Sequence, residues 1–417
     1  MKKILLFISL PFWATNFLIA QNKKESNTGN KSAFYSGIYR NFFREAGYSQ
    51  SAIDQKVAEA YHDIFEGPDK VYFEVGDSMA YVSDLKNHDA RTEGLSYGMM
   101  IAVQLNKKNV FDRIWRWTKK YLQHQDGPRA GYFAWSINPQ TMKKNSEGTA
   151  SDGELYFVTS LLFASNRWGN NSGINYYHEA REILDAMWSK DGTEGIYNII
   201  NTVHKQITFT PEGENYNFTD PSYQLPAFFD VWALYAKDGH AQFYRDCADT
   251  ARAFLHRVCS SPTGLNPDLA HFDGTPFQRG KFNPAFRYDS WRVPMNIAMD
   301  DNWFGKDRKW QENYAKRIQH FFKSKGIGSF EDQFNLDGSR PEWILRAGGV
   351  QKLRHSLGLL ATVATTEMIR KDNYDFVHAL WNARLQPYED GYFDPYYDGL
   401  LYLFSLMHLS GKYQLIK

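Results

Sequence analysis

Apolar residues recur at helical intervals through most of this 417-residue chain, and that pattern limits the folds open to it. In the segment 53–64 they stand three or four positions apart, which places them on one face of an α-helix. Similar intervals recur in 110–121, 176–187 and 310–321. Alternation typical of strands is confined to short segments such as 71–75. The pattern predicts an all-α fold of about twelve helices, joined by long aromatic-rich loops, with minor short strands.

No linker rich in Pro or Ser divides the chain after residue 31, so we predict one domain over 32–417. A helical solenoid would show a fixed sequence repeat, and the sequence has none. A closed barrel of helix pairs therefore fits the pattern best. Its long loops, rich in Tyr, Trp and Asp, would form a functional face on a rigid helical scaffold.

The first 20 residues have the composition of a secretory signal peptide. Lys2 and Lys3 precede an apolar run, 4–20, which ends in the small residue Ala20 before a polar leader, 21–31. The run is near the lower limit of about 17 residues for a transmembrane helix, and a retained anchor is the alternative. We predict cleavage near Ala20 and an exported protein, periplasmic or extracellular, with no membrane contact after cleavage.

Charge and cysteine content argue against several classes of function. The 48 Lys and Arg balance 47 Asp and Glu, so the chain lacks the basic excess with which nucleic-acid-binding proteins neutralise phosphates. Its 12 His show no metal-ligand spacing. Cys247 and Cys259 lie on one predicted helix roughly 18 Å apart, too far for a disulfide. We therefore predict free thiols, no metal, no cofactor and no nucleic-acid partner.

One motif suggests ester hydrolysis by a nucleophilic serine. The segment 94–98, Gly-Leu-Ser-Tyr-Gly, matches the nucleophile elbow of α/β-hydrolases, which would make Ser96 the nucleophile of an esterase. An elbow needs a strand before its serine, whereas 85–93 is polar and typical of a loop. We interpret the match as an accident, in which Ser96 and the glycines let a helix pack closely. The esterase alternative predicts inhibition by serine-directed reagents.

Three carboxyl groups, those of Glu93, Asp152 and Asp289, each stand near the start of a predicted apolar helix. Taken singly, each has a structural explanation, as a first-turn acid, an N-cap or an ion-pair partner. In a closed barrel, however, helix starts could converge on one cleft, and two carboxyls across an aromatic-lined cleft suit glycoside hydrolysis. Tyr223 could hold the attacking water, or its ring could pack beside two prolines.

Around these residues the chain carries four ordered motifs: Arg91-Thr92-Glu93-Gly94, Ala150-Ser151-Asp152-Gly153-Glu154, Thr219-Asp220-Pro221-Ser222-Tyr223 and Tyr288-Asp289-Ser290-Trp291-Arg292. Together they resemble glycoside hydrolase family 8, inverting enzymes built on a barrel of six helix pairs. The likeness runs from about residue 35 to the carboxyl terminus and implies an (α/α)6 barrel. It also implies these roles: general acid for Glu93, general base for Asp289, binding and distortion of the sugar for Asp152, and positioning of the water for Tyr223.

Within that family the chain is similar to the reducing-end xylose-releasing exo-oligoxylanases, most clearly in 299–305 and 317–322. In those enzymes a loop with a Leu-His-Pro segment closes the cleft, and its histidine contacts the reducing-end hydroxyl. The resemblance implies that role for His355. Arg354 and Ser356 stand where the Leu and Pro would be, and this departure leaves an endo-acting xylanase with an open cleft as the alternative.

The resulting hypothesis is an inverting hydrolase that removes xylose from the reducing end of β-1,4-xylo-oligosaccharides. Arg91 is expected to tune the pKa of Glu93. Trp135 is a candidate platform on which a sugar ring stacks. The predicted partner is the xylo-oligosaccharide substrate, and the protein is expected to be a monomer. A glycan-binding protein that kept the cleft and lost catalysis is a further alternative, which would bind without turnover.

Overall fold

The fold is given by a computed structural model, which describes residues 32–260, 262–280, 283–342, 352–370 and 373–417. The predicted signal peptide, 1–20, and the polar leader, 21–31, lie outside the described residues, so both stay predictions. Among the helices that are described, none is long and apolar enough to cross a membrane.

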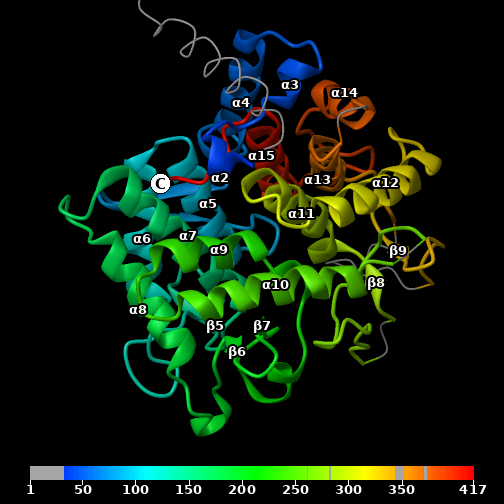
Figure 1. The fold of residues 1–417 in the computed structure, drawn as a ribbon. Coiled ribbons are helices and arrows are strands. Elements are labelled where there is room, and N and C mark those ends of the chain that lie inside the picture. The colour runs from blue at the N-terminus through cyan, green and yellow to red at the C-terminus, as the bar shows by residue number, and fades with distance from the viewer. Residues whose placement is uncertain (1–31, 261, 281–282, 343–351, 371–372) are drawn as a thin grey trace, which may run out of the picture.

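Six apolar helices form the inner ring of the molecule (Figure 1). Most of their residues are buried, which explains why their sequences are nearly continuous apolar runs rather than one-sided stripes. Each contacts the next in chain order, and the last contacts the first, so the ring is closed. The inner helices are α5 (Thr92–Gln104), α7 (Ser151–Trp168), α9 (Pro226–Tyr235), α11 (Arg292–Trp303), α13 (Leu357–Thr365) and α15 (Tyr397–Leu409).

Six further helices surround this ring, and each packs on one inner helix with an apolar face, as the helical spacing predicted. They are α4 (Gln50–Phe65), α6 (Lys108–Tyr121), α8 (Tyr176–Trp188), α10 (Ala241–Val258), α12 (Arg308–Ser324) and α14 (Asp375–Asn382). Two single-turn helices, α2 (Ala33–Ser36) and α3 (Phe42–Glu45), precede them. The described residues thus form an (α/α)6 barrel, which confirms the predicted fold class.

Short antiparallel strands lie in the loops between the helices. The predicted strand 71–75 is observed as β1 (Tyr72–Val75), which pairs with β2 (Met79–Val82). Two others lead into inner helices, since β3 (Ala90–Arg91) runs directly into α5 and β8 (Ala285–Phe286) precedes the 3-10 helix η5 (Tyr288–Trp291) before α11. The remaining strands are β4 (Ser136–Asn138), β5 (Lys143–Ser146), β6 (Ile200–Asn201), β7 (Gln206–Ile207) and β9 (Phe334–Asn335).

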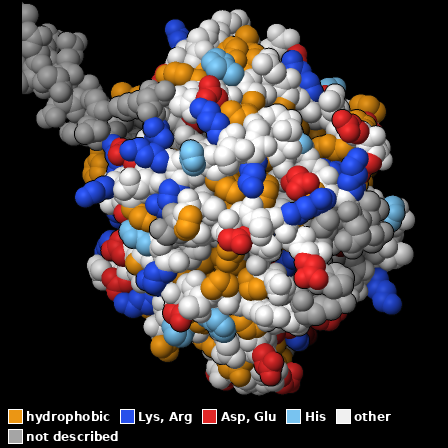
Figure 2. Space-filling model, turned by 90° about the vertical axis from the view of Figure 1, so that its right-hand side faces the viewer, with side chains coloured by type: hydrophobic (Ala, Val, Ile, Leu, Met, Phe, Trp, Pro, Cys, Tyr) orange, Lys and Arg blue, Asp and Glu red, His pale blue; other side chains and the backbone are white. Residues whose placement is uncertain are grey.

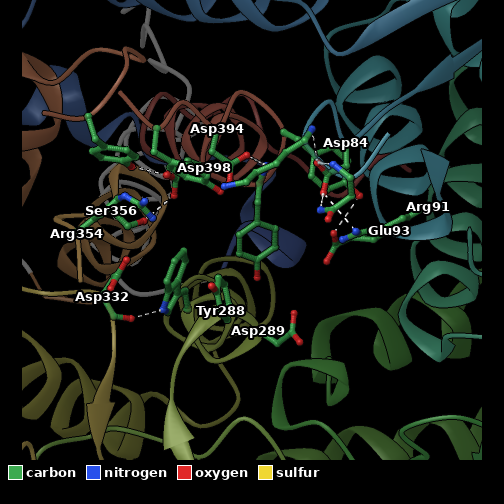
Figure 3. A pocket seen from close by; sticks show the side chains of 17 residues that line it. Asp84, Arg91, Glu93, Tyr288, Asp289, Asp332, Arg354, Ser356, Asp394 and Asp398 are labelled. Atoms are coloured by element: carbon green, nitrogen blue, oxygen red, sulfur yellow. Dashed lines mark hydrogen bonds and ion pairs between the residues drawn. The ribbon is translucent and has the colours of Figure 1, made fainter. Parts of the chain in front are cut away.

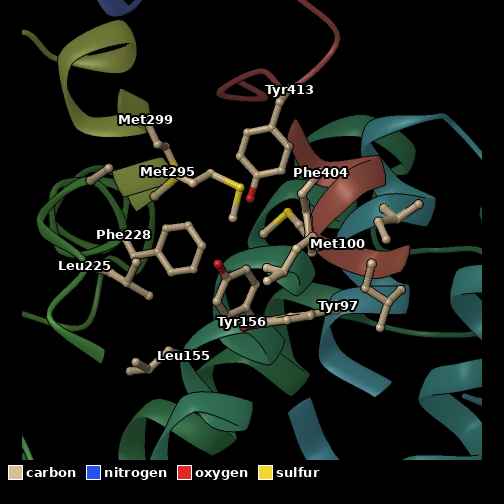
Figure 4. Packing of buried hydrophobic residues seen from close by; sticks show 14 of the residues in the cluster. Tyr97, Met100, Leu155, Tyr156, Leu225, Phe228, Met295, Met299, Phe404 and Tyr413 are labelled. Atoms are coloured by element: carbon tan, nitrogen blue, oxygen red, sulfur yellow. The ribbon is translucent and has the colours of Figure 1, made fainter. Parts of the chain in front are cut away.

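Aromatic rings fill the centre of the barrel (Figure 4). Tyr97 of α5 contacts Tyr156 of α7 and Phe404 of α15 edge to face, with ring centroids 4.7 and 5.1 Å apart. Tyr156 in turn meets Phe228 of α9 at 4.8 Å. Four inner helices therefore pack through one aromatic cluster, which accounts for part of the 16% aromatic content of the chain.

Two glycines allow the first turns of the inner helices to approach one another closely. A Cβ atom at Gly153 would lie 2.5 Å from the Cβ of Thr92, and one at Gly94 would lie 2.3 Å from the ring of Tyr396. A side chain at either position would push α5 away from α7 or from the start of α15. The close-packing interpretation of Gly94 is therefore confirmed.

A buried ion-pair cluster joins four helices on one side of the barrel. Arg252 of α10 contacts Asp300 of α11 through two nitrogens, at 2.6 and 2.9 Å, and Asp230 of α9 at 2.7 Å. Gln311 of α12 donates a further hydrogen bond to Asp300 at 2.8 Å. All four side chains are buried, so each partner compensates for the lost hydration of the others.

Candidate active site

The starts of the inner helices bring four carboxyl groups around one guanidinium. Arg292, the first residue of α11, has its Nη1 3.1 Å from Oε2 of Glu93 and 3.0 Å from Oδ2 of Asp152. Its Nη2 lies 2.8 Å from Oδ1 of Asp289 and 3.9 Å from Oδ2 of Asp220. The three carboxyls that the sequence places at separate helix starts therefore converge at one point.

Burial keeps part of this cluster protonated. One cation cannot balance four negative charges away from water, so the carboxyls cannot all ionise. Burial raises the pKa of Glu93 to about 8, with help from the charges of Asp152 and Asp289 and against the opposing effect of Arg292. Glu93 is therefore protonated at neutral pH, the form in which a carboxyl can act as an acid. The hydroxyl of Tyr396 donates a hydrogen bond to its Oε1 at 3.1 Å.

Asp289 is more accessible than its neighbours, because its side chain is 40% exposed, against 15% for Glu93 and 8% for Asp152. Tyr288, just before it, has a φ of 42°, a left-handed conformation that is rare for a bulky residue. Backbone strain of this kind concentrates at functional sites, where the surrounding structure holds it in place. Here it occurs at the turn between β8 and α11 that presents Asp289.

The cluster opens into a cavity of about 450 Å³, which Glu93 and Asp289 both line. Figure 3 shows their carboxyl groups approaching the same space from different parts of the chain. The walls combine aromatic rings with carboxyls and arginines, and such a surface can bind sugars by stacking and by hydrogen bonds. The aromatic lining residues are Tyr288, Trp291, Tyr388, Tyr392, Tyr396 and Tyr397.

Tyr223 ends the 3-10 helix η4 (Pro221–Tyr223) beside the cluster. The guanidinium carbon of Arg292 lies 5.5 Å from the centre of its ring, and the ring stacks on Phe209 with centroids 6.2 Å apart. Burial raises the pKa of Tyr223 well above its ordinary value, so the hydroxyl stays protonated and can donate a hydrogen bond. Its role in holding the attacking water, and the alternative of a ring packed beside two prolines, both stay predictions.

Arg91 also lines the cavity, where Asp84 and Asp89 hold it at 3.4 and 3.1 Å. Its charge lowers the pKa of Glu93, which is the direction expected of a tuning residue. Trp135 is half-buried, and its ring centre lies 5.7 Å from the guanidinium carbon of Arg91. Trp135 lies outside the lining of this cavity, so its role as a stacking platform stays a prediction.

His355 lies beside the cavity rather than in its lining. Its Nδ1 is 2.9 Å from the carbonyl oxygen of Phe330, and its ring packs edge to face on that phenyl ring. The flanking residues, Arg354 and Ser356, line the cavity instead. Contact between His355 and a reducing-end hydroxyl therefore stays a prediction from the resemblance.

Sequence reasoning missed two residues of the site, Arg292 and Tyr396. Arg292 ends the motif around Asp289, for which a cap or an ion-pair partner is the structural explanation, and an ion pair between the two side chains is present. Its reach to Glu93 and Asp152 depends on ring closure, which no local pattern reveals. Tyr396 could have been suspected from its position, since it immediately precedes an apolar helix in an aromatic-rich loop.

Other reactive groups lie away from this chemistry. Cys247 and Cys259 are free and buried, as their spacing predicted. Ser96 is fully buried inside α5, where its hydroxyl donates to the carbonyl oxygen of Glu93 at 2.9 Å, so it cannot meet an ester substrate. In the part of the chain that the structure describes, no group of His, Cys, Asp and Glu is arranged to hold a metal ion.

The family model for glycosyl hydrolases family 8 matches residues 80–408. A reducing end xylose-releasing exo-oligoxylanase of Halalkalibacterium halodurans is 39% identical to this chain, and the match covers 92% of this chain and 96% of that protein. A reducing end xylose-releasing exo-oligoxylanase of Bifidobacterium adolescentis is 37% identical, and the match covers 89% of this chain and 96% of that protein. The structure of Rex8A from Paenibacillus barcinonensis complexed with xylose is similar with a TM-score of 0.84 at 35% identity, covering 93% of this chain and 100% of that one. The chain therefore belongs to glycosyl hydrolases family 8.

Proposed function

We propose that this glycoside hydrolase releases xylose from the reducing end of β-1,4-xylo-oligosaccharides, with inversion at the anomeric carbon. Convergence of Glu93 and Asp289 on Arg292 at the cavity supports the catalytic part most directly. The substrate is supported by the two relatives at 37% and 39% identity, which are named for reducing-end xylose release. An aromatic and polar cavity wall suits a sugar.

In this mechanism Glu93 protonates the glycosidic oxygen, and Asp289 takes a proton from the water that attacks the anomeric carbon on the opposite face. The two carboxyl oxygens that contact Arg292 lie within roughly 8 Å of each other, the reach of two hydrogen bonds through one guanidinium. That bound is compatible with the roughly 6.5–9.5 Å that an inverting pair leaves for the water. Tyr223 would donate a hydrogen bond to the water, and Asp152 would hold the sugar in a distorted ring.

Two carboxyls with opposite tasks need different environments. Burial favours the neutral form of Glu93. Asp289 keeps contact with solvent and accepts a hydrogen bond from Arg292. The acid and the base of this mechanism therefore have different surroundings.

We further propose that the protein is exported, to a periplasm or to the outside of the cell, and acts as a monomer. Export is supported by the charged and apolar pattern of residues 1–20. One chain supplies both Glu93 and Asp289, so the proposed chemistry does not need a second copy.

The proposal is tested with xylotriose and xylotetraose that carry an isotopic label on the reducing-end anomeric carbon. We expect labelled xylose to appear first, while the newly formed reducing end of the remaining oligomer has the inverted, α configuration. Chromatography identifies the labelled product, and proton NMR at early times gives the configuration. Release of unlabelled xylose before or together with the first labelled xylose, or a β product, would contradict the proposal, and an Asp289→Asn variant should show no turnover above background.

On the alkaline side, the pH profile of kcat/KM should fall with the pKa of Glu93 in the free enzyme, about 8. Activity falls as the pH rises through that value, because Glu93 loses the proton that it must donate. The measurement is kcat/KM on xylotetraose from about pH 5 to about pH 10 at constant ionic strength. Glu367→Gln removes a different buried carboxyl, which is not part of the cavity lining, and should leave the limb in place. A limb that already falls well below neutral pH would contradict this assignment.

A further inference from the structure

One buried carboxyl beside the reacting groups has no part in the proposed mechanism. The side chain of Asp220 is 1% exposed, and its Oδ2 lies 3.9 Å from Nη2 of Arg292. The molecular surface offers less, because Figure 2 shows acidic, basic and apolar side chains interspersed among the described residues of the face in view. Burying a carboxyl costs stability, so the place of Asp220 in the site calls for an explanation.

The two oxygens of Asp220 face different partners. Oδ1 accepts a hydrogen bond from the backbone N–H of Ser222 at 2.7 Å, and this bond caps the 3-10 helix η4, which ends at Tyr223. Oδ2 is buried and has no hydrogen-bond partner within the part of the chain that the structure describes. Unpartnered buried oxygens are rare in native proteins, and functional sites are among the places that keep them.

Through the η4 turn, Asp220 sets the position of Tyr223. Its backbone carbonyl oxygen accepts a hydrogen bond from the N–H of Tyr223 at 3.0 Å. The same turn is tied to α11, since the side-chain amide of Asn296 donates a hydrogen bond to the carbonyl oxygen of Ser222 at 3.0 Å. Asn296 stands about one helical turn after Arg292 on α11. The tyrosine proposed to hold the water is thus fixed to the helix that begins with Arg292.

Through Oδ2, Asp220 faces the nitrogen that also holds Asp289. Nη2 of Arg292 lies 2.8 Å from Oδ1 of Asp289 and 3.9 Å from Oδ2 of Asp220. Because the two carboxyls share this nitrogen, the position of each one affects the other. Burial, together with the charge of Asp289, raises the pKa of Asp220 well above its ordinary value and so favours its protonated form. A neutral Asp220 does not compete with Asp289 for the charge of Arg292.

We propose that Asp220 is a positioning residue for the attacking water. Its Oδ1 sets Tyr223, and its Oδ2 sets Arg292 and with it Asp289. One side chain thus holds the proposed donor and the proposed acceptor of the water relative to each other. Asp220 lies outside the cavity lining, so it acts through these neighbours. This inference rests on the proposed function, and it concerns the water side of the reaction rather than the leaving side.

The test uses Asp220→Asn, because an amide has one oxygen and cannot serve both contacts. We expect kcat on xylotriose to fall about 10–100-fold while KM changes by less than about threefold, since the cavity lining is unaltered. The Tm should stay close to the native value, because the oxygen that is lost has no hydrogen-bond partner among the described residues. Asp238→Asn is the matched control, since Asp238 accepts the backbone N–H of His240 at 2.9 Å in a similar turn, and it should keep the native kcat.

A second substrate distinguishes the water side from the leaving side. In β-xylobiosyl fluoride the C–F bond breaks without a proton from Glu93: fluoride leaves with the electron pair, and Asp289 takes a proton from the attacking water. Glu93→Gln should therefore regain most of its lost rate on this substrate. Asp220→Asn should remain about 10–100-fold slower than the native protein, because water must still be positioned.

The outcomes separate this inference from the proposed function. If the native protein cleaves xylotriose and Asp220→Asn keeps a near-native kcat, the inference is wrong and the proposed function stands. A clear fall in Tm with a raised KM, or recovery of Asp220→Asn on the fluoride, would also overturn the inference. If the native protein does not cleave xylo-oligosaccharides, the proposed function itself fails. Should Asp220→Asn not fold, Asp220→Ser, which keeps an oxygen for the turn and none for Arg292, is expected to show the same loss of kcat.

Discussion

Replacing Glu93 by Gln is expected to lower kcat about 10²–10⁴-fold, because the amide cannot donate the proton that a carboxylic acid supplies to the leaving oxygen. Gln has nearly the same shape, so the contacts to Arg292 and Tyr396 can largely persist. The measurement is single-turnover hydrolysis of xylotetraose at neutral pH. Glu367→Gln, the same substitution at another buried site, should keep near-native activity. Near-native turnover by Glu93→Gln would exclude Glu93 as the acid.

The same substitution should make the protein more stable toward alkaline pH. The pKa of Glu93 is about 8 in the folded state and near its ordinary value of 4.5 in the unfolded chain. Between these values the folded state binds more protons, so its free energy of unfolding falls as the pH rises. Gln does not titrate, and its advantage in Tm over the native protein should therefore grow from about pH 5 to about pH 8. A Tm difference that is constant over this window would contradict the raised pKa.

Arg252→Met is expected to lower the free energy of unfolding by about 3–5 kcal/mol, because it leaves Asp230 and Asp300 buried without their cation. Lys306 still contacts Asp230 at 2.6 Å, so Asp300 bears most of the loss. Chemical denaturation measures the effect. Activity per folded molecule should be kept, since this cluster lies outside the cavity lining.

Two further variants identify the cause of that loss. Arg245→Met, on the exposed face of the same helix, should change stability by less than about 0.5 kcal/mol. Adding Asp300→Asn to Arg252→Met removes the orphaned charge and is expected to restore part of the stability. If the double variant is as unstable as Arg252→Met, lost packing rather than an unpaired charge is responsible.

The helices could be predicted because apolar spacing is a local property of the chain. The segment 53–64 shows it, since its spaced apolar residues became the buried face of α4. The six-fold ring could not be predicted in this way. Inner helices such as α13 and α15 are apolar on all sides, so their sequences do not indicate which helix each one contacts. Their arrangement came from the family resemblance, and the structure confirms it.

In the candidate site, too, some residues could be predicted from local sequence and others depend on long-range contacts. Glu93, Asp152 and Asp289 could be found because each follows a loop and opens a helix, and a closed barrel brings helix starts together. Arg292 contacts residues 199 and 140 positions away, so its central place could not be read from its own motif. Arg354 and His355 are adjacent in sequence, and which of the two lines the cavity depends on the path of the chain before α13.

The contact between α15 and α5 has a consequence for how activity is gained during folding. Tyr396 and Glu93 are 303 residues apart in the sequence, yet they share a hydrogen bond where the ring closes. Long-range contacts form late, since the chain must first lose the entropy of a large loop. The helices can therefore be fully formed before Glu93 is desolvated and acquires its high pKa. Recovery of hydrolysis after denaturation would mark the joining of the first and last inner helices, which secondary structure alone does not detect.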